Sequence, residues 1–178
     1  MRYDPLILDV DGTLTDGRLY LGEQGEPARA FHTQDGLAIR WFQRLGGTVI
    51  ILTGKSSHGV ARRAAELEIA HVVQGSNDKL ADARRLFASL GRELGGAAVV
   101  GDDLPDLPLF HACGFSIAPA NAVPEVCAAA KFVTKRPGGA GAVREAIEHL
   151  LRRDGRWAEV LQHYSSPREA EAVGRGGP

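Results

Sequence analysis

The sequence has few of the features that mark cross-linked, membrane-embedded or nucleic-acid-binding proteins. Its 178 residues include only two cysteines, Cys113 and Cys127, which suggest neither a disulfide framework nor a zinc site. No apolar run approaches the roughly 18 residues of a membrane-spanning helix. The formal net charge of -1 lacks the basic excess that is typical of nucleic-acid binders. We therefore expect a cytoplasmic protein that binds neither membranes nor nucleic acid.

The composition is that of an ordinary globular chain. Hydrophobic residues make up 44% and charged residues 24%, which suits one domain with its own core. An apolar segment begins near Leu6, so we expect no secretory signal. We predict one domain over residues 1–153, followed by a tail over 154–178 that is helical near 157–164 and then flexible.

Short apolar segments alternate with amphipathic ones along the predicted domain. Strands are expected at 6–10, 48–52, 71–73, 97–100, 115–117 and 132–133. Helices are expected at 35–45, 56–67, 78–90, 105–112, 123–129 and 141–153. A small β-hairpin is expected at about 18–32. This alternation predicts an α/β fold of the Rossmann-like, three-layer type, with a parallel sheet and helices on both faces.

Polar residues follow several of these strands, where a parallel sheet binds its ligands. Asp9 and Asp11 end the first strand, Thr53 follows the second, and Asp102 follows a later one. Lys79 lies at the start of a predicted helix at the same edge. Carboxylates bind Mg²⁺, whereas a hydroxyl, a lysine and main-chain N–H groups bind phosphate. The pattern indicates a site for Mg²⁺ and a phosphate group.

This order of motifs resembles the haloacid dehalogenase superfamily of phosphotransferases. Segment 9–13, Asp-Val-Asp-Gly-Thr, matches its first motif, and Thr53, Lys79 and the acid pair 102–103 match the other three. A narrower resemblance, over about residues 5–153, is to the 3-deoxy-D-manno-octulosonate 8-phosphate phosphatases. Four segments carry it: 11–17, 31–36, 74–79 and 138–145.

The resemblance implies a catalytic role for each motif residue. Asp9 attacks phosphorus and forms an aspartyl-phosphate, while Asp11 protonates the leaving oxygen and then activates water. Asp9, Asp102 and the main-chain carbonyl of Asp11 hold Mg²⁺. Without a cation, two like charges 4 Å apart repel by about 4 kcal/mol at an effective dielectric of 20. Thr53 and Lys79 bind the phosphate and balance its charge.

Further residues are expected around this centre. Asp103 and Asp106 would orient the metal ligands from behind, or cap a helix. Gly54, Lys55 and Arg63 would contact the substrate, although Arg63 could equally lie on the surface. The resembling phosphatases usually have arginine where this chain has Lys55, and also where it has Ala140. Both differences concern substrate recognition rather than phosphoryl transfer, because lysine lacks the bidentate guanidinium fork.

No cap domain fits between the motifs. The interval from Asp9 to Thr53 holds only the hairpin and one helix, and the interval from Lys79 to Asp102 holds one helix and one strand. Water would have to be excluded by other means. The resemblance implies a homotetramer in which the hairpin packs against a neighbouring subunit.

The sequence thus predicts a Mg²⁺-dependent phosphatase for 3-deoxy-D-manno-octulosonate 8-phosphate, in lipopolysaccharide biosynthesis. Three alternatives remain. The substrate could be another nonulosonic acid phosphate or, at a capless site, a phosphorylated protein. The chain could also be a non-catalytic oligomerisation or regulatory module, because the same fold hosts different functions.

Overall fold

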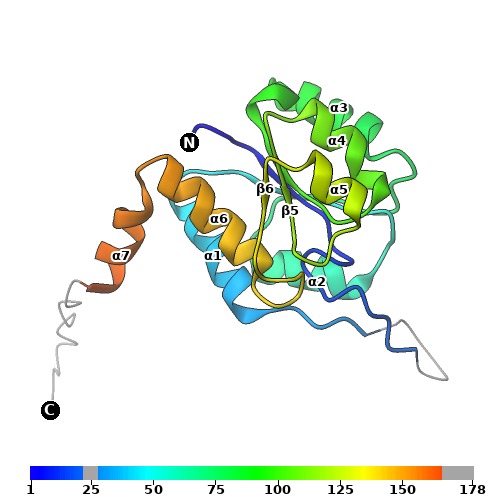
Figure 1. Ribbon diagram of the computed structural model, residues 1–178, viewed down its shortest axis with the longest axis horizontal. Helices are drawn as coiled ribbons and strands as arrows, with labels where there is room; N and C mark the ends of the chain where they lie inside the picture. Colours follow the sequence, from blue (N-terminus) through cyan, green and yellow to red (C-terminus); the bar gives the residue numbers. More distant parts are fainter. Residues whose placement is uncertain (22–27, 166–178) are drawn as a thin grey trace, which may run out of the picture.

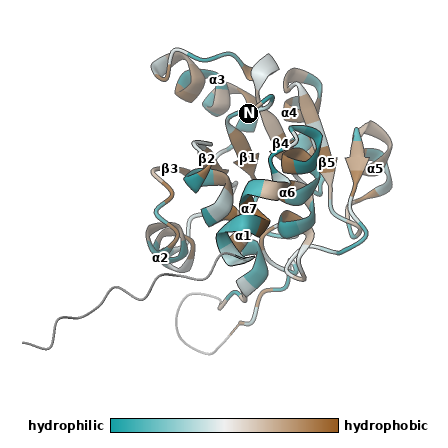
Figure 2. Ribbon diagram, turned by 90° about the vertical axis from the view of Figure 1, so that its left-hand side faces the viewer, coloured by the Kyte–Doolittle hydropathy of each residue, from teal (hydrophilic) through white to brown (hydrophobic). Residues whose placement is uncertain are grey.

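The computed structural model describes residues 1–21 and 28–165, and these contain one six-stranded parallel sheet. The strand order is β3-β2-β1-β4-β5-β6, so the first strand lies in the middle, as Figure 2 shows. The strands are β1 (Leu6–Leu8), β2 (Val49–Leu52), β3 (His71–Val73), β4 (Ala98–Val100), β5 (Phe115–Ala118) and β6 (Phe132–Val133).

Helices cover both faces of the sheet, so the predicted three-layer α/β fold is confirmed (Figure 1). One layer consists of α1 (Thr33–Arg44), α2 (His58–Glu66), α6 (Ala142–Arg153) and α7 (Trp157–Ser165). The other layer consists of α3 (Lys79–Ser89), α4 (Leu107–Ala112) and α5 (Pro124–Ala129). Two short 3-10 helices, η1 (Leu94–Gly96) and η2 (Leu104–Asp106), precede β4 and α4.

The core follows from the alternation of side chains along buried strands. In β1, Leu6 and Leu8 pack into the cluster under α1 and α6, whereas Ile7 packs into the cluster under α3 and α4. Both clusters are lined by apolar strand residues, which is why the strands appear as apolar runs rather than as alternating patterns. Helices α1 and α6 lie side by side on one face (Figure 1).

The predicted hairpin at about 18–32 is only partly within the described residues. The structure has a single antiparallel bridge between Tyr20 and Ala28, and residues 22–27 lie outside the described part of the chain. A two-stranded ribbon with no third strand beside it is marginally stable, which explains why residues 18–21 and 28–32, the described part of the predicted hairpin, form no regular strand. Over the described residues, the connection from β1 to β2 otherwise contains only α1, so it holds no cap domain.

The start of the tail joins the core. Trp157 and Val160 of α7 are buried in the same cluster as α1 and α6, and the indole of Trp157 lies edge-on to that of Trp41 at 5.4 Å. The helix predicted near 157–164 is therefore present. The flexible part predicted after it falls on residues 166–178, which lie outside the described residues. The division into a domain and a tail at residue 153 stays a prediction.

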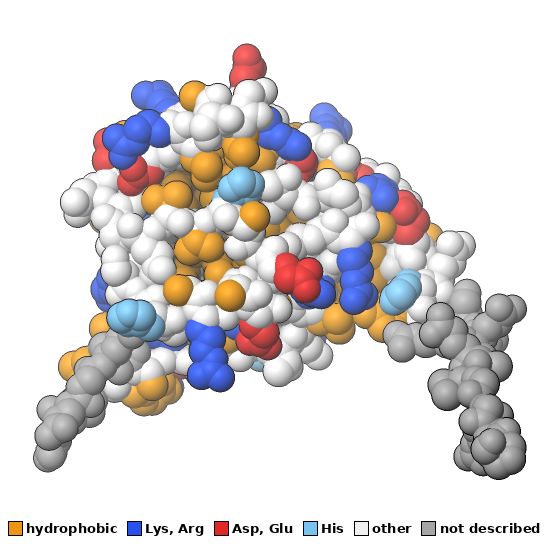
Figure 3. All heavy atoms as spheres, turned by 180° about the vertical axis from the view of Figure 1, so that it is seen from behind, with side chains coloured by type: hydrophobic (Ala, Val, Ile, Leu, Met, Phe, Trp, Pro, Cys, Tyr) orange, Lys and Arg blue, Asp and Glu red, His pale blue; other side chains and the backbone are white. Residues whose placement is uncertain are grey.

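Among the described residues, no helix has both the length and the apolar character needed to cross a membrane. On the face seen from behind, acidic and basic side chains are interspersed rather than separated into one charged field (Figure 3).

The packing of α1 in the core predicts how two substitutions on this helix change the free energy of unfolding. Phe42 is fully buried between the sheet and α6, whereas Leu37 on the same helix is 40% exposed. Replacing Phe42 with Ala should lower the free energy of unfolding by about 3–5 kcal/mol, because it removes a buried ring and leaves a cavity. The control Leu37→Ala should cost less than about 1 kcal/mol. Urea unfolding measures both, and equal losses would contradict this packing.

Candidate active site

The site is built at the carboxyl end of β1. This strand pairs with β4 in parallel, and the ladder ends where the Asp9 N–H donates to the carbonyl of Val100 at 3.0 Å. The chain then turns at once, because the N–H groups of Thr13 and Thr15 both donate to the carbonyl of Val10, at 3.2 and 3.0 Å. A tight turn directly after the strand therefore carries Asp9 and Asp11.

The turn lies directly against Asp102, which follows β4. Gly12 has a φ of +93°, and a Cβ atom built on it would lie 2.0 Å from a carboxylate oxygen of Asp102. Only glycine permits both the conformation and the close approach. The hydroxyl of Thr13 donates to Asp102 Oδ1 at 3.0 Å, which fixes the orientation of that carboxylate.

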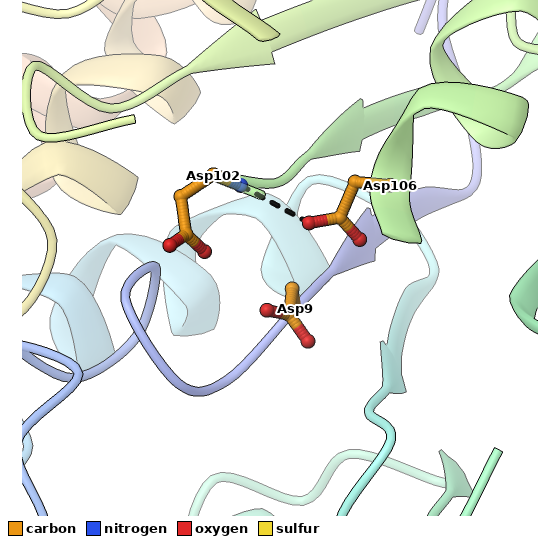
Figure 4. A group of neighbouring side chains, drawn as sticks. All are labelled: Asp9, Asp102 and Asp106. Atoms are coloured by element: carbon orange, nitrogen blue, oxygen red, sulfur yellow. Dashed lines mark hydrogen bonds between the residues drawn. The ribbon is translucent and has the colours of Figure 1, made fainter. Parts of the chain in front are cut away.

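Three carboxyl groups meet beside this turn. Asp9, Asp102 and Asp106 each offer an oxygen within 4.8 Å of the others, and Figure 4 shows them gathered from β1, the end of β4 and η2. The oxygens of Asp106 are already engaged. Oδ1 accepts from Lys79 Nζ at 2.6 Å, and Oδ2 accepts from the N–H groups of Asp102 and Asp103 at 3.1 and 3.4 Å. Asp9 and Asp102 are therefore the better candidates to hold a cation.

The ammonium group of Lys79 lies within this cluster. Its Nζ lies 2.8 Å from Asp9 Oδ1 and 2.6 Å from Asp106 Oδ1, and its side chain is 8% exposed. It is the first residue of α3, behind Asp78, whose side chain accepts from the N–H of Ala81 and caps the helix. Helix capping thus fixes the backbone from which Lys79 reaches inward.

The charges in this cluster do not balance. Burial and the charge of Asp106 raise the pKa of Asp9 to about 7, despite the Lys79 ammonium. Burial likewise raises the pKa of Asp102 to about 6. Burial alone would lower the pKa of Lys79, but the carboxylates of Asp9 and Asp106 outweigh it and raise that pKa. One ammonium cannot neutralise three carboxylates, so the cluster favours a proton or a second cation.

Asp11 points toward other partners. Arg29 Nε donates to Asp11 Oδ1 at 2.7 Å, and Lys55 Nζ lies 3.7 Å from Asp11 Oδ2. The side chain of Asp11 is thus held by two cations outside the cluster of three acids. Its predicted role as a metal ligand concerned the main-chain carbonyl, and that role stays a prediction.

An open pocket of about 670 Å³ spans these groups. Asp9, Asp11 and Lys79 line one side, and Thr53 lies beside them at the end of β2. Thr53 is held there because its N–H donates to the carbonyl of Val73 at 3.0 Å. The remaining lining residues are Gly54, Lys55, Ser76, Asn77, Asp78, Asp103, Pro105, Asp106 and Pro108.

The residues predicted to surround the centre differ in whether they reach the pocket. Asp103 caps the start of η2, accepting from the N–H of Leu104 at 2.7 Å, and Asp106 is 1% exposed behind Asp102. Gly54 and Lys55 line the pocket. Arg63 does not: it pairs with Glu66 at 2.8 Å and lies over the ring of Phe31, beside a separate small hollow. The structure therefore brings Arg63 to none of the other predicted site residues.

Sequence reasoning missed two residues that shape this site. Arg29 holds Asp11, and Asn121 bridges the turn after β1 to a later loop by donating to Gly12 O at 2.9 Å and accepting from Gly138 N at 2.5 Å. Asn121 lies in a turn, and the hairpin predicted around Arg29 did not indicate which residue its side chain would contact. The only sequence cue at Arg29 is its place between two small residues, Ala28 and Ala30.

Comparisons with known proteins identify the family. A model described as haloacid dehalogenase-like hydrolase matches residues 67–147. The 3-deoxy-D-manno-octulosonate 8-phosphate phosphatase KdsC of Escherichia coli (strain K12) is 42% identical over 155 residues, covering 87% of this chain and 82% of that protein. The chain belongs to this phosphatase family. It is therefore a phosphoric monoester hydrolase, and the resemblance inferred from the motifs is confirmed.

Solved structures of family members have the same fold. A probable YrbI family phosphatase from Pseudomonas syringae pv. phaseolica 1448a has a TM-score of 0.91 at 38% identity, covering 93% of this chain and 94% of that one. The octulosonate phosphatase from Moraxella catarrhalis has a TM-score of 0.87 at 38% identity, covering 91% and 94%. It was solved in complex with a magnesium ion, a phosphate ion and a KDO molecule.

The raised pKa of Asp9 predicts a pH-dependent stability for the metal-free phosphatase. As the pH rises, the unfolded chain loses this proton near 3.8, whereas the folded chain keeps it until about 7. The stability linked to protonated Asp9 is therefore complete below 3.8 and is lost as the pH passes about 7. We predict that Asp9→Asn becomes progressively more stable relative to the wild type between about pH 4 and about pH 7, above which the difference stays constant.

Urea unfolding of both proteins in EDTA at several pH values measures this difference. A difference in unfolding free energy that stays constant over the range would contradict the raised pKa of Asp9.

Proposed function

We propose that this phosphatase hydrolyses 3-deoxy-D-manno-octulosonate 8-phosphate with Mg²⁺, through an aspartyl-phosphate on Asp9. The observation that carries the proposal is the approach of Asp9 to Asp102 and Lys79, where Asp9 and Lys79 line an open pocket. A nucleophile, a cation and a surplus of carboxylates are the parts that phosphoryl transfer through a metal requires.

The residues present fit a magnesium ion. Lys79 Nζ lies against Oδ1 of Asp9 and the Thr13 hydroxyl donates to Oδ1 of Asp102, so each carboxylate keeps lone pairs for a cation; magnesium accepts one or two carboxylates together with phosphate oxygens. When bound, magnesium offsets the charge that otherwise keeps a phosphate dianion away from a carboxylate. The Moraxella catarrhalis relative contains magnesium, and the Haemophilus influenzae relative was solved in a cobalt-bound form.

The two chemical steps can be assigned to residues of this chain. In the first, a carboxylate oxygen of Asp9 attacks phosphorus, the P–O bond to the sugar breaks, and Asp11 gives its proton to the leaving oxygen. In the second, Asp11 takes a proton from water as that water attacks phosphorus, which releases phosphate and restores Asp9. Lys79 balances negative charge on Asp9 and the phosphate, and the Thr53 hydroxyl donates to a phosphate oxygen.

A sugar acid suits the chemistry of the pocket. Lys55 lines it with a side chain that is 57% exposed, so an ammonium is available to a substrate carboxylate. Gly54 beside it leaves room for the sugar. We assign no substrate contact to Arg63, because Arg63 pairs with Glu66 outside the pocket. Relatives named for this substrate support the same choice over another nonulosonic acid phosphate.

We further propose a cytoplasmic homotetramer acting in lipopolysaccharide biosynthesis. The segment leading to the bridge exposes Leu19, Tyr20 and Leu21 at 39%, 54% and 77%. Neighbouring exposed apolar side chains of this kind are typical of a protein–protein contact. A neighbour packed there would narrow an otherwise open pocket, in place of a cap domain.

A substrate panel tests the proposed activity. Purified protein with Mg²⁺ should release phosphate fastest from 3-deoxy-D-manno-octulosonate 8-phosphate, and more slowly from nonulosonic acid phosphates and neutral sugar phosphates. Asp9→Asn should fold and lose at least about 1,000-fold in kcat, because the nucleophile is gone. Preference for a carboxylate-free sugar would overturn the substrate, retained turnover in Asp9→Asn would overturn the nucleophile, and an inactive wild type would favour a non-catalytic module.

Metal removal tests the proposed cofactor. EDTA should abolish turnover and excess Mg²⁺ should restore it. Mg²⁺ should also raise the Tm more at about pH 8 than at about pH 5.5, because Asp9 and Asp102 must lose their protons to bind it.

The matched variants for this measurement are Asp102→Asn and Asp154→Asn. The first should lose most of the Mg²⁺-induced rise in Tm. The second should keep it, because Asp154 accepts from the N–H of Arg2 at the end of α6. An equal rise in the Tm of both variants would count against a magnesium site at Asp102.

A further inference from the structure

The guanidinium of Arg29 donates hydrogen bonds to both carboxylate oxygens of Asp11. Nε lies 2.7 Å from Oδ1 and Nη2 lies 3.4 Å from Oδ2, so the contact is a fork rather than a single bond. The side chain of Arg29 is only 4% exposed, and that of Asp11 is 18% exposed. A buried arginine on a surface loop is unusual, because its charge must be paired to stay out of water.

The chain holds Arg29 in this place from both sides. Before it, Ala28 forms the antiparallel bridge with Tyr20, and after it Phe31 packs against the core ahead of α1. Ala28 and Ala30 are exposed, so extended backbone alternation turns the side chain between them toward the body of the protein. Figure 1 shows this segment leaving the body and returning to α1.

The second cation at Asp11 is held far less firmly. Lys55 Nζ lies 3.7 Å from one oxygen, and its side chain is 57% exposed. An ammonium is a point charge on a flexible stem, whereas a guanidinium fork fixes the plane of the carboxylate it binds. Arg29 therefore determines how the carboxylate of Asp11 faces the pocket, and Lys55 is left available to substrate.

We propose that Arg29 is the positioning residue for Asp11 in the second chemical step. This inference rests on the proposed function, in which Asp11 takes a proton from the water that attacks the aspartyl-phosphate. The fork binds the carboxylate form of Asp11, which is the form that accepts this proton. Arg29 itself exchanges no proton with water or substrate. Misplacing a catalytic group by about 1 Å can cost on the order of 100-fold in rate.

The proposal predicts a split between kcat and kcat/KM for 4-nitrophenyl phosphate. Nitrophenolate leaves without needing a proton, so kcat/KM, which reports the first step, should fall less than about 5-fold in Arg29→Met. Hydrolysis of the aspartyl-phosphate should slow, and kcat should fall by about 100-fold. Nitrophenol should then appear in a burst equal to the enzyme concentration, with phosphate bound covalently to Asp9.

Two variants accompany Arg29→Met. Arg29→Lys keeps the charge without the fork, and should lose about 10-fold in kcat while still showing the burst; it carries the test if Arg29→Met does not fold. Arg18→Met is the matched control, because Arg18 lies on the same segment with a side chain that is 77% exposed and should leave kcat within about 2-fold.

Parallel measurements on Asp11→Asn separate this inference from the proposed function. If Asp11→Asn gives the burst and the Arg29 variants do not, the role of Arg29 is overturned and that of Asp11 stands. Equal falls in kcat and kcat/KM without a burst would make Arg29 a structural residue only, and unchanged kinetics would also overturn its role. If Asp11→Asn keeps full kcat, the proposed roles of Asp11 and Arg29 both fail, while the proposed activity stands.

Discussion

The structure depends on the crowding of three carboxyl groups at one edge of a buried sheet. Because β1 lies between β2 and β4 in parallel register, Asp9 and Asp102 must emerge side by side. Asp106 joins them from η2, and the ammonium group of Lys79 pairs with Asp9 and Asp106. Folding therefore creates an excess of negative charge away from water, which a protein tolerates only if another positive charge relieves it. That excess links the fold to the chemistry of the site.

The other features of the site keep these charges in place. Gly12 lets the tight turn after β1 lie directly against Asp102, and Thr13 orients that carboxylate. The same turn directs Asp11 away from the cluster, toward Arg29. Asp9 and Asp11 thus have different surroundings. Asp9 lies beside other carboxylates, whereas Asp11 lies beside the cations of Arg29 and Lys55. This difference in surroundings supports the proposed roles of Asp9 as nucleophile and Asp11 as proton carrier.

Much of the fold could be predicted from the sequence, because buried parallel strands appear as short apolar runs and the amphipathic segments between them as helices. The gathering of Asp9, Asp11, Thr53 and Lys79 around one pocket could be predicted because the carboxyl ends of parallel strands share one edge, whereas Ser76 and Asn77, which also line it, were not predicted. Contacts between irregular segments could not. Arg29 and Asn121 take their partners from tertiary packing, whereas Arg63 pairs with Glu66 on its own helix. Over the described residues, the predicted hairpin has one antiparallel bridge, and a ribbon with no third strand is marginally stable.

Locating the metal in crystals grown with Mn²⁺ tests the central claim most directly. The anomalous difference map should contain one peak in the pocket, with carboxylate oxygens of both Asp9 and Asp102 within about 2.0–2.3 Å. A peak held by neither carboxylate, or an empty pocket at a Mn²⁺ concentration that supports full turnover, would contradict the account.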